Sequence, residues 1–198
     1  MNPVTLSDEE RWFVALFASV QMLRTKKFRD QLQGFLVQNP EEQEKLAKAV
    51  RIKVDDVRDL ANNAQARQIL RNAHRYAVKL FQMDWAGLTS QKPANPFWTS
   101  DNPVVPYDNL YKSELTGGAF LDTPGIQVFF PISPRFLLMM LMSGHYRSTP
   151  VRPVRDKKEV WKANNSQFAN SDRFIFASRD PEALLKLLAL SGKDIQSG

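Results

Sequence analysis

The stretch FWTSDNPVV, residues 97–105, holds the side chains of this sequence that are best suited to chemistry. An acid, an amide and a proline interrupt two short strand-like runs, and Asp101 stands at the centre of the turn. A carboxylate held at the end of a strand can activate water or stabilise cationic charge. Turn chemistry explains the same residues, because Asp and Asn bond their own backbone and Pro fixes the next φ angle. The sequence therefore predicts either a catalytic pair, Asp101 and Asn102, or a plain turn.

A guanidinium on the first helical segment is the expected partner of Asp101. Gln21 and Arg24 lie one turn apart in a stretch with helical apolar spacing, so both side chains can point inward. A buried guanidinium needs a partner, because leaving it alone is strongly destabilising. We therefore predict an Arg24–Asp101 pair, which either orients a catalytic acid or only joins two layers of the fold. Gln21 is expected to contact substrate beside it.

A second turn, PISP at 131–134, is expected to bring Ser133 and Arg135 to the same edge of the sheet, although a tight hairpin alone also accounts for it. Ser133 lies outside the G-x-S-x-G pattern, so a serine hydrolase is not expected. The remaining candidates for substrate binding are rings that could stack a base, groups that could hold phosphates, and one amide: Trp98, Tyr107, His145, Arg147 and Asn165.

The charge of the chain favours an anionic partner. Its 198 residues include 27 Lys and Arg against 21 Asp and Glu, which gives a formal net charge of +6. The basic residues are spread along the chain, so a solvated basic surface is as good an interpretation as nucleic-acid binding.

Cysteine is absent and there are two histidines, so neither a metal nor a cofactor is predicted. The lack of cysteine, of a signal peptide and of a long apolar run predicts a soluble, cytoplasmic protein without membrane contact.

The elements that must position these residues divide the predicted single domain, 1–198, into two halves. Residues 1–89 are expected to be helical, with a capping box at Ser7 and Glu10, apolar periodicity from 12 to 36, a restart at 39–42, and a long helix that ends near Trp85. Residues 90–198 are expected to hold strands at 97–99, 104–106, 126–130, 136–142 and 173–178, and helices at 159–170 and 181–191. The prolines of the basic loop at 145–158 indicate irregular structure.

This order predicts an α+β fold, in which an N-terminal helical layer packs on a small, mainly antiparallel sheet with a C-terminal helix. Four stretches also occur in the order and rough spacing typical of one family: LSDEERWFVALFASVQMLRTKKFRD, FWTSDNPVV, VFFPISPRFLLMML and NSQFANSDRFIFAS. The chain thereby resembles the bacterial family known as domain of unknown function 4238. The resemblance implies no particular activity. It does imply a further N-terminal segment that opens on a His followed by Val-Pro, after which this sequence begins. If that His takes part in chemistry, either a partner chain supplies it or the site is altered.

These features together predict a nucleic-acid-directed enzyme of bacterial defence type, with a pocket centred on Asp101 that performs base excision or another hydrolysis. The acidic turn and the Pro-Ser-Pro turn loosely resemble the paired loops of uracil-DNA glycosylases, and no P-D…E-x-K arrangement supports a metal nuclease. Two alternatives stay open. One is a non-catalytic module that binds nucleic acid or protein through the loop at 145–158, and the other is a hydrolase of a small polar metabolite with Asp101 as its base.

Overall fold

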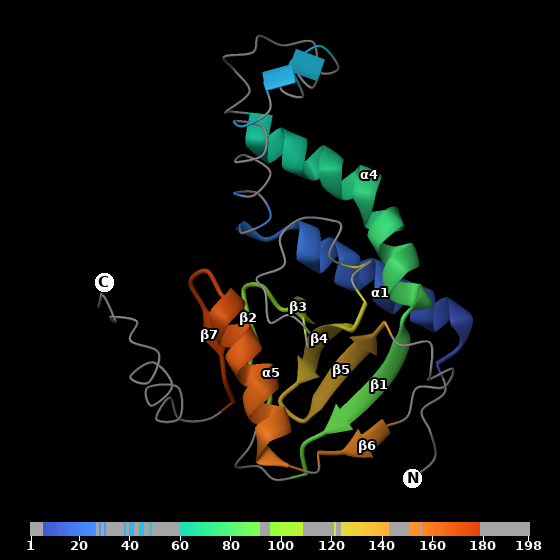
Figure 1. The fold of residues 1–198 in the computed structure, drawn as a ribbon, viewed down its shortest axis with the longest axis vertical. Coiled ribbons are helices and arrows are strands. Elements are labelled where there is room, and N and C mark those ends of the chain that lie inside the picture. The colour runs from blue at the N-terminus through green and yellow to red at the C-terminus, as the bar shows by residue number, and fades with distance from the viewer. Residues whose placement is uncertain are drawn as a thin grey trace.

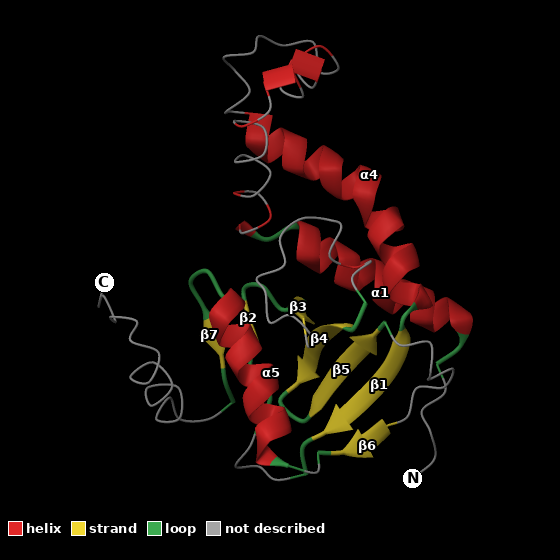
Figure 2. Cartoon of the chain, viewed as in Figure 1, coloured by secondary structure: helices red, strands yellow, loops and turns green. Residues whose placement is uncertain are grey.

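The computed structural model describes residues 6–26, 28, 30, 38, 40–41, 44–45, 48, 60–91, 96–108, 121, 124–142, 151–154 and 156–178. Its helices are α1 (Asp8–Leu23), α4 (Leu60–Gln82) and α5 (Lys157–Asn170). Its strands are β1 (Asp84–Thr89), β2 (Thr99–Ser100), β3 (Val105–Asp108), β4 (Ile126–Ser133), β5 (Phe136–Leu141), β6 (Val151–Pro153) and β7 (Ile175–Phe176). Figure 1 shows the order of these elements along the chain, and Figure 2 shows a central sheet with helices on its two sides. The predicted α+β fold is confirmed.

The first helix begins where the sequence predicts. The Ser7 hydroxyl accepts a hydrogen bond from the Glu10 amide at 3.2 Å, and the Glu10 carboxylate accepts one from the Ser7 amide at 2.8 Å. This reciprocal capping box satisfies two amides at the helix start. The backbone bond to Ser7, and then the bond to its hydroxyl, hold the pKa of Glu10 below its ordinary value.

The same helix ends earlier than the periodicity predicts, at Leu23. The Thr25 hydroxyl donates to the Met22 carbonyl at 3.0 Å and accepts from the Phe28 amide at 3.2 Å. One side chain thus satisfies backbone groups on both sides of the break, so the continuous helix predicted through 36 is wrong. The helix expected to restart at 39–42 and the one at 181–191 fall wholly or largely outside the described residues.

The larger sheet has the strand order β3-β4-β5-β1-β6. β1 pairs antiparallel with β5 and parallel with β6, and the other neighbours in this sheet are antiparallel. β2 and β7 form a separate antiparallel pair. The two edge strands of the larger sheet each contain a proline, Pro106 in β3 and Pro153 in β6.

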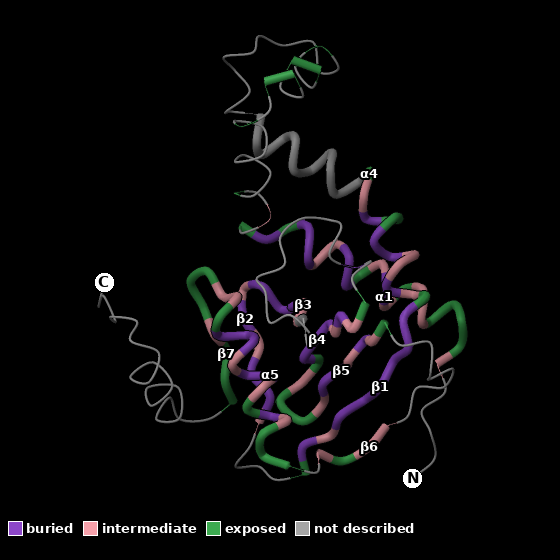
Figure 3. The backbone as a smooth tube through the Cα atoms, in the orientation of Figure 1, coloured by how far each residue is buried: buried purple, intermediate pink, exposed green. Residues whose placement is uncertain are grey.

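Two of these strands were not expected. The segment Asp84–Thr89, predicted as the end of a helix, is the strand β1, which is buried along almost all of its length (Figure 3). A strand buried on both faces lacks the alternation that identifies strands in a sequence. β6 lies in the loop predicted to be irregular, and its Pro153 is tolerated because it ends an edge strand. The other predicted strands and the helix at 159–170 overlap observed elements, with shifted ends.

The sheet buries apolar side chains on both faces. On one face, α1 and α4 pack against residues from β1, β4 and β5, which include Trp85, Val128, Phe130, Leu138 and Met140. On the other face, Val160 and Ala163 of α5 pack against Leu88, Phe129, Leu137 and the irregular segment at Phe97. No described helix combines the length and the apolar character that crossing a membrane would require.

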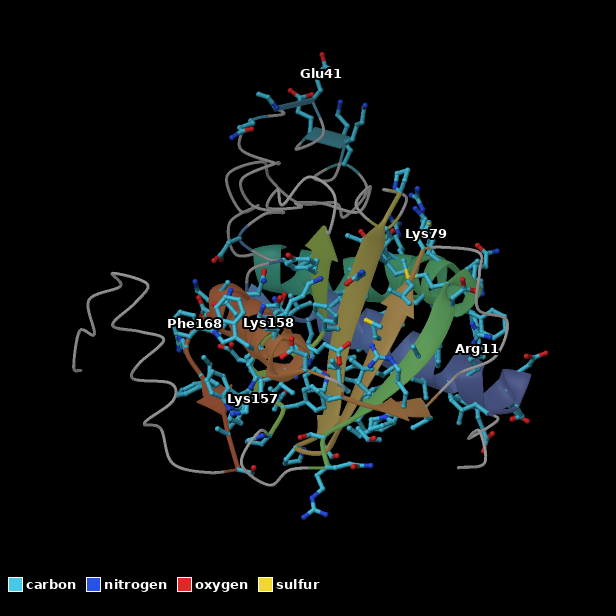
Figure 4. All side chains as sticks on the ribbon, turned by 60° about the horizontal axis from the view of Figure 1, so that its bottom comes forward. Arg11, Glu41, Lys79, Lys157, Lys158 and Phe168 are labelled. Atoms are coloured by element: carbon cyan, nitrogen blue, oxygen red, sulfur yellow. The ribbon has the colours of Figure 1, made fainter. Side chains whose placement is uncertain are left out.

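Arg11 of α1 holds the end of α4 in place (Figure 4). Its Nη2 donates to the carbonyls of Phe81 and Met83 at 3.1 and 2.5 Å. The guanidinium carbon lies 5.4 Å from the ring centroid of Phe81 and 4.9 Å from that of Trp85. A cation is favourable here, because carbonyls at a helix end carry partial negative charge and aromatic faces attract cations.

We expect Arg11→Met to lower the free energy of unfolding by about 2 kcal/mol, because the two carbonyls lose a charged donor while the apolar contact remains. Urea unfolding followed by circular dichroism measures the change. Arg24→Met is the matched control, since Arg24 is exposed at the end of the same helix, and it should stay within about 0.5 kcal/mol of the unchanged protein. Equal losses in the two variants would contradict this role for Arg11.

Candidate functional site

The carboxylate of Asp101 is fixed by backbone amides. Its Oδ1 accepts from the Asp172 amide at 3.0 Å, and its Oδ2 accepts from the Arg173 amide at 2.8 Å. The Asp101 amide donates to the Phe174 carbonyl at 3.1 Å, directly beyond the pairing of β2 with β7. Asp101 therefore clamps the turn that connects α5 to β7.

The predicted pair between Arg24 and Asp101 is not formed. Arg24 follows the last residue of α1, is exposed to solvent, and donates from Nε to Gln21 Oε1 at 2.5 Å. The helix ends at Leu23, so the inward direction inferred from a longer helix does not hold for Arg24. Gln21 is half-buried and serves as the partner of Arg24.

The ionic link between the two layers comes from Lys26 instead. Lys26 Nζ lies 2.9 Å from Asp30 Oδ2 and 3.2 Å from Asp172 Oδ1. The hydrogen bond to Asp30 and then that to Asp172 raise the pKa of Lys26 above its ordinary value. Because the Asp172 amide also bonds Asp101, the segment after α1 reaches the Asp101 turn through Lys26 and Asp172.

Side-chain amides of α5 hold the rest of the FWTSDNPVV stretch. Asn164 accepts from the Trp98 amide and donates to the Pro96 carbonyl, both at 2.9 Å. It thus pairs with an extended backbone as a neighbouring strand would. One turn on, Gln167 Nε2 donates to the Pro103 carbonyl at 2.9 Å.

A hydroxyl and a second amide complete these contacts. The Ser100 hydroxyl lies 2.9 Å from both Gln167 Oε1 and the Asn102 carbonyl, and it can donate to one of them at a time. Asn102 Nδ2 donates to the carbonyl of Asn170 at 3.3 Å. Gln167 is fully buried, and Ser100 and Asn102 are 5% and 8% exposed, so solvent cannot replace these bonds. Asn102, predicted to be catalytic, therefore has a structural bond to the end of α5.

Two aromatic residues predicted to stack a base have other surroundings. Trp98 is 6% exposed, so its ring has little free surface in this structure, and its role in stacking a ligand stays a prediction. Tyr107 is half-buried, and Lys162 Nζ lies 4.2 Å from its ring centroid. Burial lowers the pKa of Lys162, and Gln127 Oε1 lies 3.4 Å from the same ammonium. Tyr107 thus offers one ring face to a lysine of its own chain.

The second predicted turn is a hairpin. Ser133 Oγ accepts from the Arg135 amide at 3.2 Å, and the neighbouring Pro134 carbonyl accepts from the Phe97 amide at 2.9 Å. Among the described residues, no hydrogen bond or ion pair joins Ser133 or Arg135 to the Asp101 turn. The expected convergence of the two turns is therefore not seen in these contacts.

The other predicted residues are less informative. Asn165 is half-buried on α5, but the amide that faces the interior is its neighbour Asn164. His145 and Arg147 lie outside the described residues. In the part of the chain that the structure describes, no three His, Asp or Glu side chains gather as a metal site requires.

The residues that prediction from sequence missed are the buried amides and Lys26. Asn164 and Gln167 stand three positions apart on α5, so they lie on one face of the helix, and both are buried. Burial of such a face is unusual, because side-chain amides are mostly exposed. The extended segment from Pro96 to Pro103, whose backbone groups they bond, explains why these two amides are inside.

The contacts define an α+β domain in which side-chain amides of α5 hold the irregular segment from Pro96 to Pro103. The chain belongs to the family described as Protein of unknown function (DUF4238), which matches residues 1–181. The comparisons with curated proteins and with solved structures gave no match. Two of the four stretches that carry the resemblance, FWTSDNPVV and NSQFANSDRFIFAS, contact each other through Gln167 and through the amides that bond Asp101.

We expect Gln167→Met to lower the free energy of unfolding by about 2 kcal/mol or more, because the buried Pro103 carbonyl loses its donor. Asn165→Met places the same side chain two positions away, where the described amide makes no such bond, and should cost about 0.5 kcal/mol or less. Chemical denaturation of both variants measures the difference. Similar losses would contradict a specific role for Gln167.

Asp101→Asn tests the clamp. An amide offers one acceptor oxygen where the carboxylate offers two, and its NH₂ group would face a backbone N–H donor. We expect a loss of about 1–3 kcal/mol in unfolding free energy. Asp30→Asn, at the exposed ion pair with Lys26, should change stability by less than about 1 kcal/mol. A fully stable Asp101→Asn variant would contradict the structural role.

Proposed function

We propose that this protein binds nucleic acid through the outer face of α4. The observation that carries the proposal is the charge of this helix. All charged residues in the sequence of α4 are basic and stand four positions apart: Arg67, Arg71, Arg75 and Lys79. Four residues of α-helix rise by about 6 Å, so the basic positions form one stripe along the helix.

Burial supports an outward direction for the middle of this stripe. Ala73, Tyr76, Ala77 and Leu80 of α4 are buried. These positions lie on the opposite side of the helix from Arg71 and Arg75, which are exposed. Lys79 is half-buried at the edge of the stripe, near the end of α4 (Figure 4).

The stripe is unfavourable for the helix itself. Like charges four residues apart destabilise a helix by about 0.2–0.5 kcal/mol per pair. The sequence of α4 has no acid to offset them, and no described carboxylate forms an ion pair with Arg71 or Arg75. A phosphate backbone would supply the missing negative charge, and the net charge of +6 favours its approach.

The enzymatic form of the proposal is a hydrolase, such as a base-excising enzyme, that uses Asp101. Its support is limited to the fixed position of a half-buried carboxylate at a strand end. Both carboxylate oxygens of Asp101 accept hydrogen bonds from backbone amides of a turn. Nucleic-acid binding through α4 therefore has the better support, and catalysis by Asp101 stays a prediction. A cytoplasmic location, which the absence of cysteine favours, would give the protein access to nucleic acid.

We expect the double variant Arg71→Ala/Arg75→Ala to bind DNA more weakly and with a shallower salt dependence. Each phosphate contact contributes about −0.9 to the slope of log K against log salt for a duplex and about −0.7 for a single strand, so the slope should decrease by nearly twice that value. Fluorescence anisotropy with labelled oligonucleotides over a series of KCl concentrations measures it.

The matched control is Lys157→Ala/Lys158→Ala, which removes the same formal charge from exposed positions at the start of α5 (Figure 4). This variant should keep the slope of the unchanged protein. Equal decreases in both double variants would indicate a general charge effect, and the absence of salt-dependent binding would overturn the proposal.

A further inference from the structure

We infer that Phe174 and Phe176 form a stacking site for unpaired nucleic-acid bases. The inference rests on the proposed function and names the state of the ligand, single-stranded DNA or RNA. It concerns a surface on β7, separate from the basic stripe of α4.

The two rings lie side by side on the surface, Phe174 directly before β7 and Phe176 within it. Residues two apart in an extended chain point to the same side, and Phe174 and Phe176 are 59% and 56% exposed. Their centroids are 6.4 Å apart, and their planes are inclined by 31°. Phenylalanine is usually buried, so two exposed rings side by side indicate a surface that binds something.

The backbone beneath the rings is fixed. The Phe174 carbonyl accepts from the Asp101 amide, and the two amides that precede it, those of Asp172 and Arg173, bond the Asp101 carboxylate. Phe176 pairs with Thr99 of β2. A ligand therefore does not have to order this strand, which lowers the entropic cost of binding. The Asp101 turn thus acts as a positioning element for the two rings.

Charge near the rings favours a nucleic acid over an apolar protein partner. The side chain of Arg173, next to Phe174, is 70% exposed, and its Nε lies 3.5 Å from Asp172 Oδ2. No hydrogen bond or ion pair among the described residues occupies its Nη groups. Lys26 places a further cation 3.2 Å from Asp172 Oδ1.

The acids in this region already have partners. Asp30 and Asp172 pair with Lys26, and Asp101 accepts hydrogen bonds from two backbone amides. Arg173 can hold a phosphate while the rings contact bases. Only unpaired bases offer a free face for such stacking, because those of a duplex are already stacked on each other.

The test uses the double variant Phe174→Leu/Phe176→Leu in the full chain. Leucine keeps an apolar side chain but has no aromatic face, so an apolar protein contact would tolerate it and base stacking would not. We expect the affinity for a single-stranded oligonucleotide to fall on the order of tenfold for each ring, while duplex affinity stays unchanged. A single strand that carries 2-aminopurine reports stacking directly, since its fluorescence should be quenched by the unchanged protein and not by the variant.

The outcomes separate this inference from the proposed function. Loss of binding in Arg71→Ala/Arg75→Ala with unchanged single-strand binding and quenching in the leucine variant would overturn the stacking site alone. Absence of salt-dependent binding to any oligonucleotide would overturn the proposed function and this inference with it. A change of oligomeric state in the leucine variant, seen by size-exclusion chromatography with light scattering and without loss of single-strand affinity, would identify β7 as a protein contact and overturn the stacking site.

Discussion

The arrangement of this protein depends on how one irregular segment satisfies its backbone. Between Pro96 and Pro103 the chain passes through the interior, and only Thr99 and Ser100 have a partner strand. An unsatisfied buried backbone group costs about 1–3 kcal/mol, so the remaining groups require other partners. The Phe97 and Asp101 amides bond backbone carbonyls, whereas Asn164 and Gln167 bond the groups that face α5. These side-chain amides fix where α5 can lie on the sheet.

Structural features that depend on residues close together in the sequence could be predicted from it. The capping box at Ser7 and the hairpin between β4 and β5 both follow from residues a few positions apart. The strand β1 was missed because uniform burial removes its alternation, and β6 because its pairing with β1 joins distant parts of the chain. Local patterns cannot reveal partners that tertiary packing selects.

The candidate site shows the same division between position and partner. Asp101 does stand at a strand end, as its motif predicts, but its partners are the amides of Asp172 and Arg173 rather than a guanidinium. The cross-layer cation was expected two positions too early, because the end of α1 leaves Arg24 in solvent and Lys26 next to Asp172. A polar motif at a strand end is thus no evidence of catalysis until its hydrogen bonds are known. Here the Asp101 turn fixes the backbone before β7, so it would affect the binding of nucleic acid only by positioning Phe174 and Phe176.

Both margins of the larger sheet end in a strand that contains proline, β3 with Pro106 and β6 with Pro153. A proline has no amide hydrogen, so a strand approaching either margin would find a donor missing from the ladder. Such margins discourage edge-to-edge growth of the kind that leads to fibrils. Pairing of a second copy along either margin of the larger sheet is therefore disfavoured.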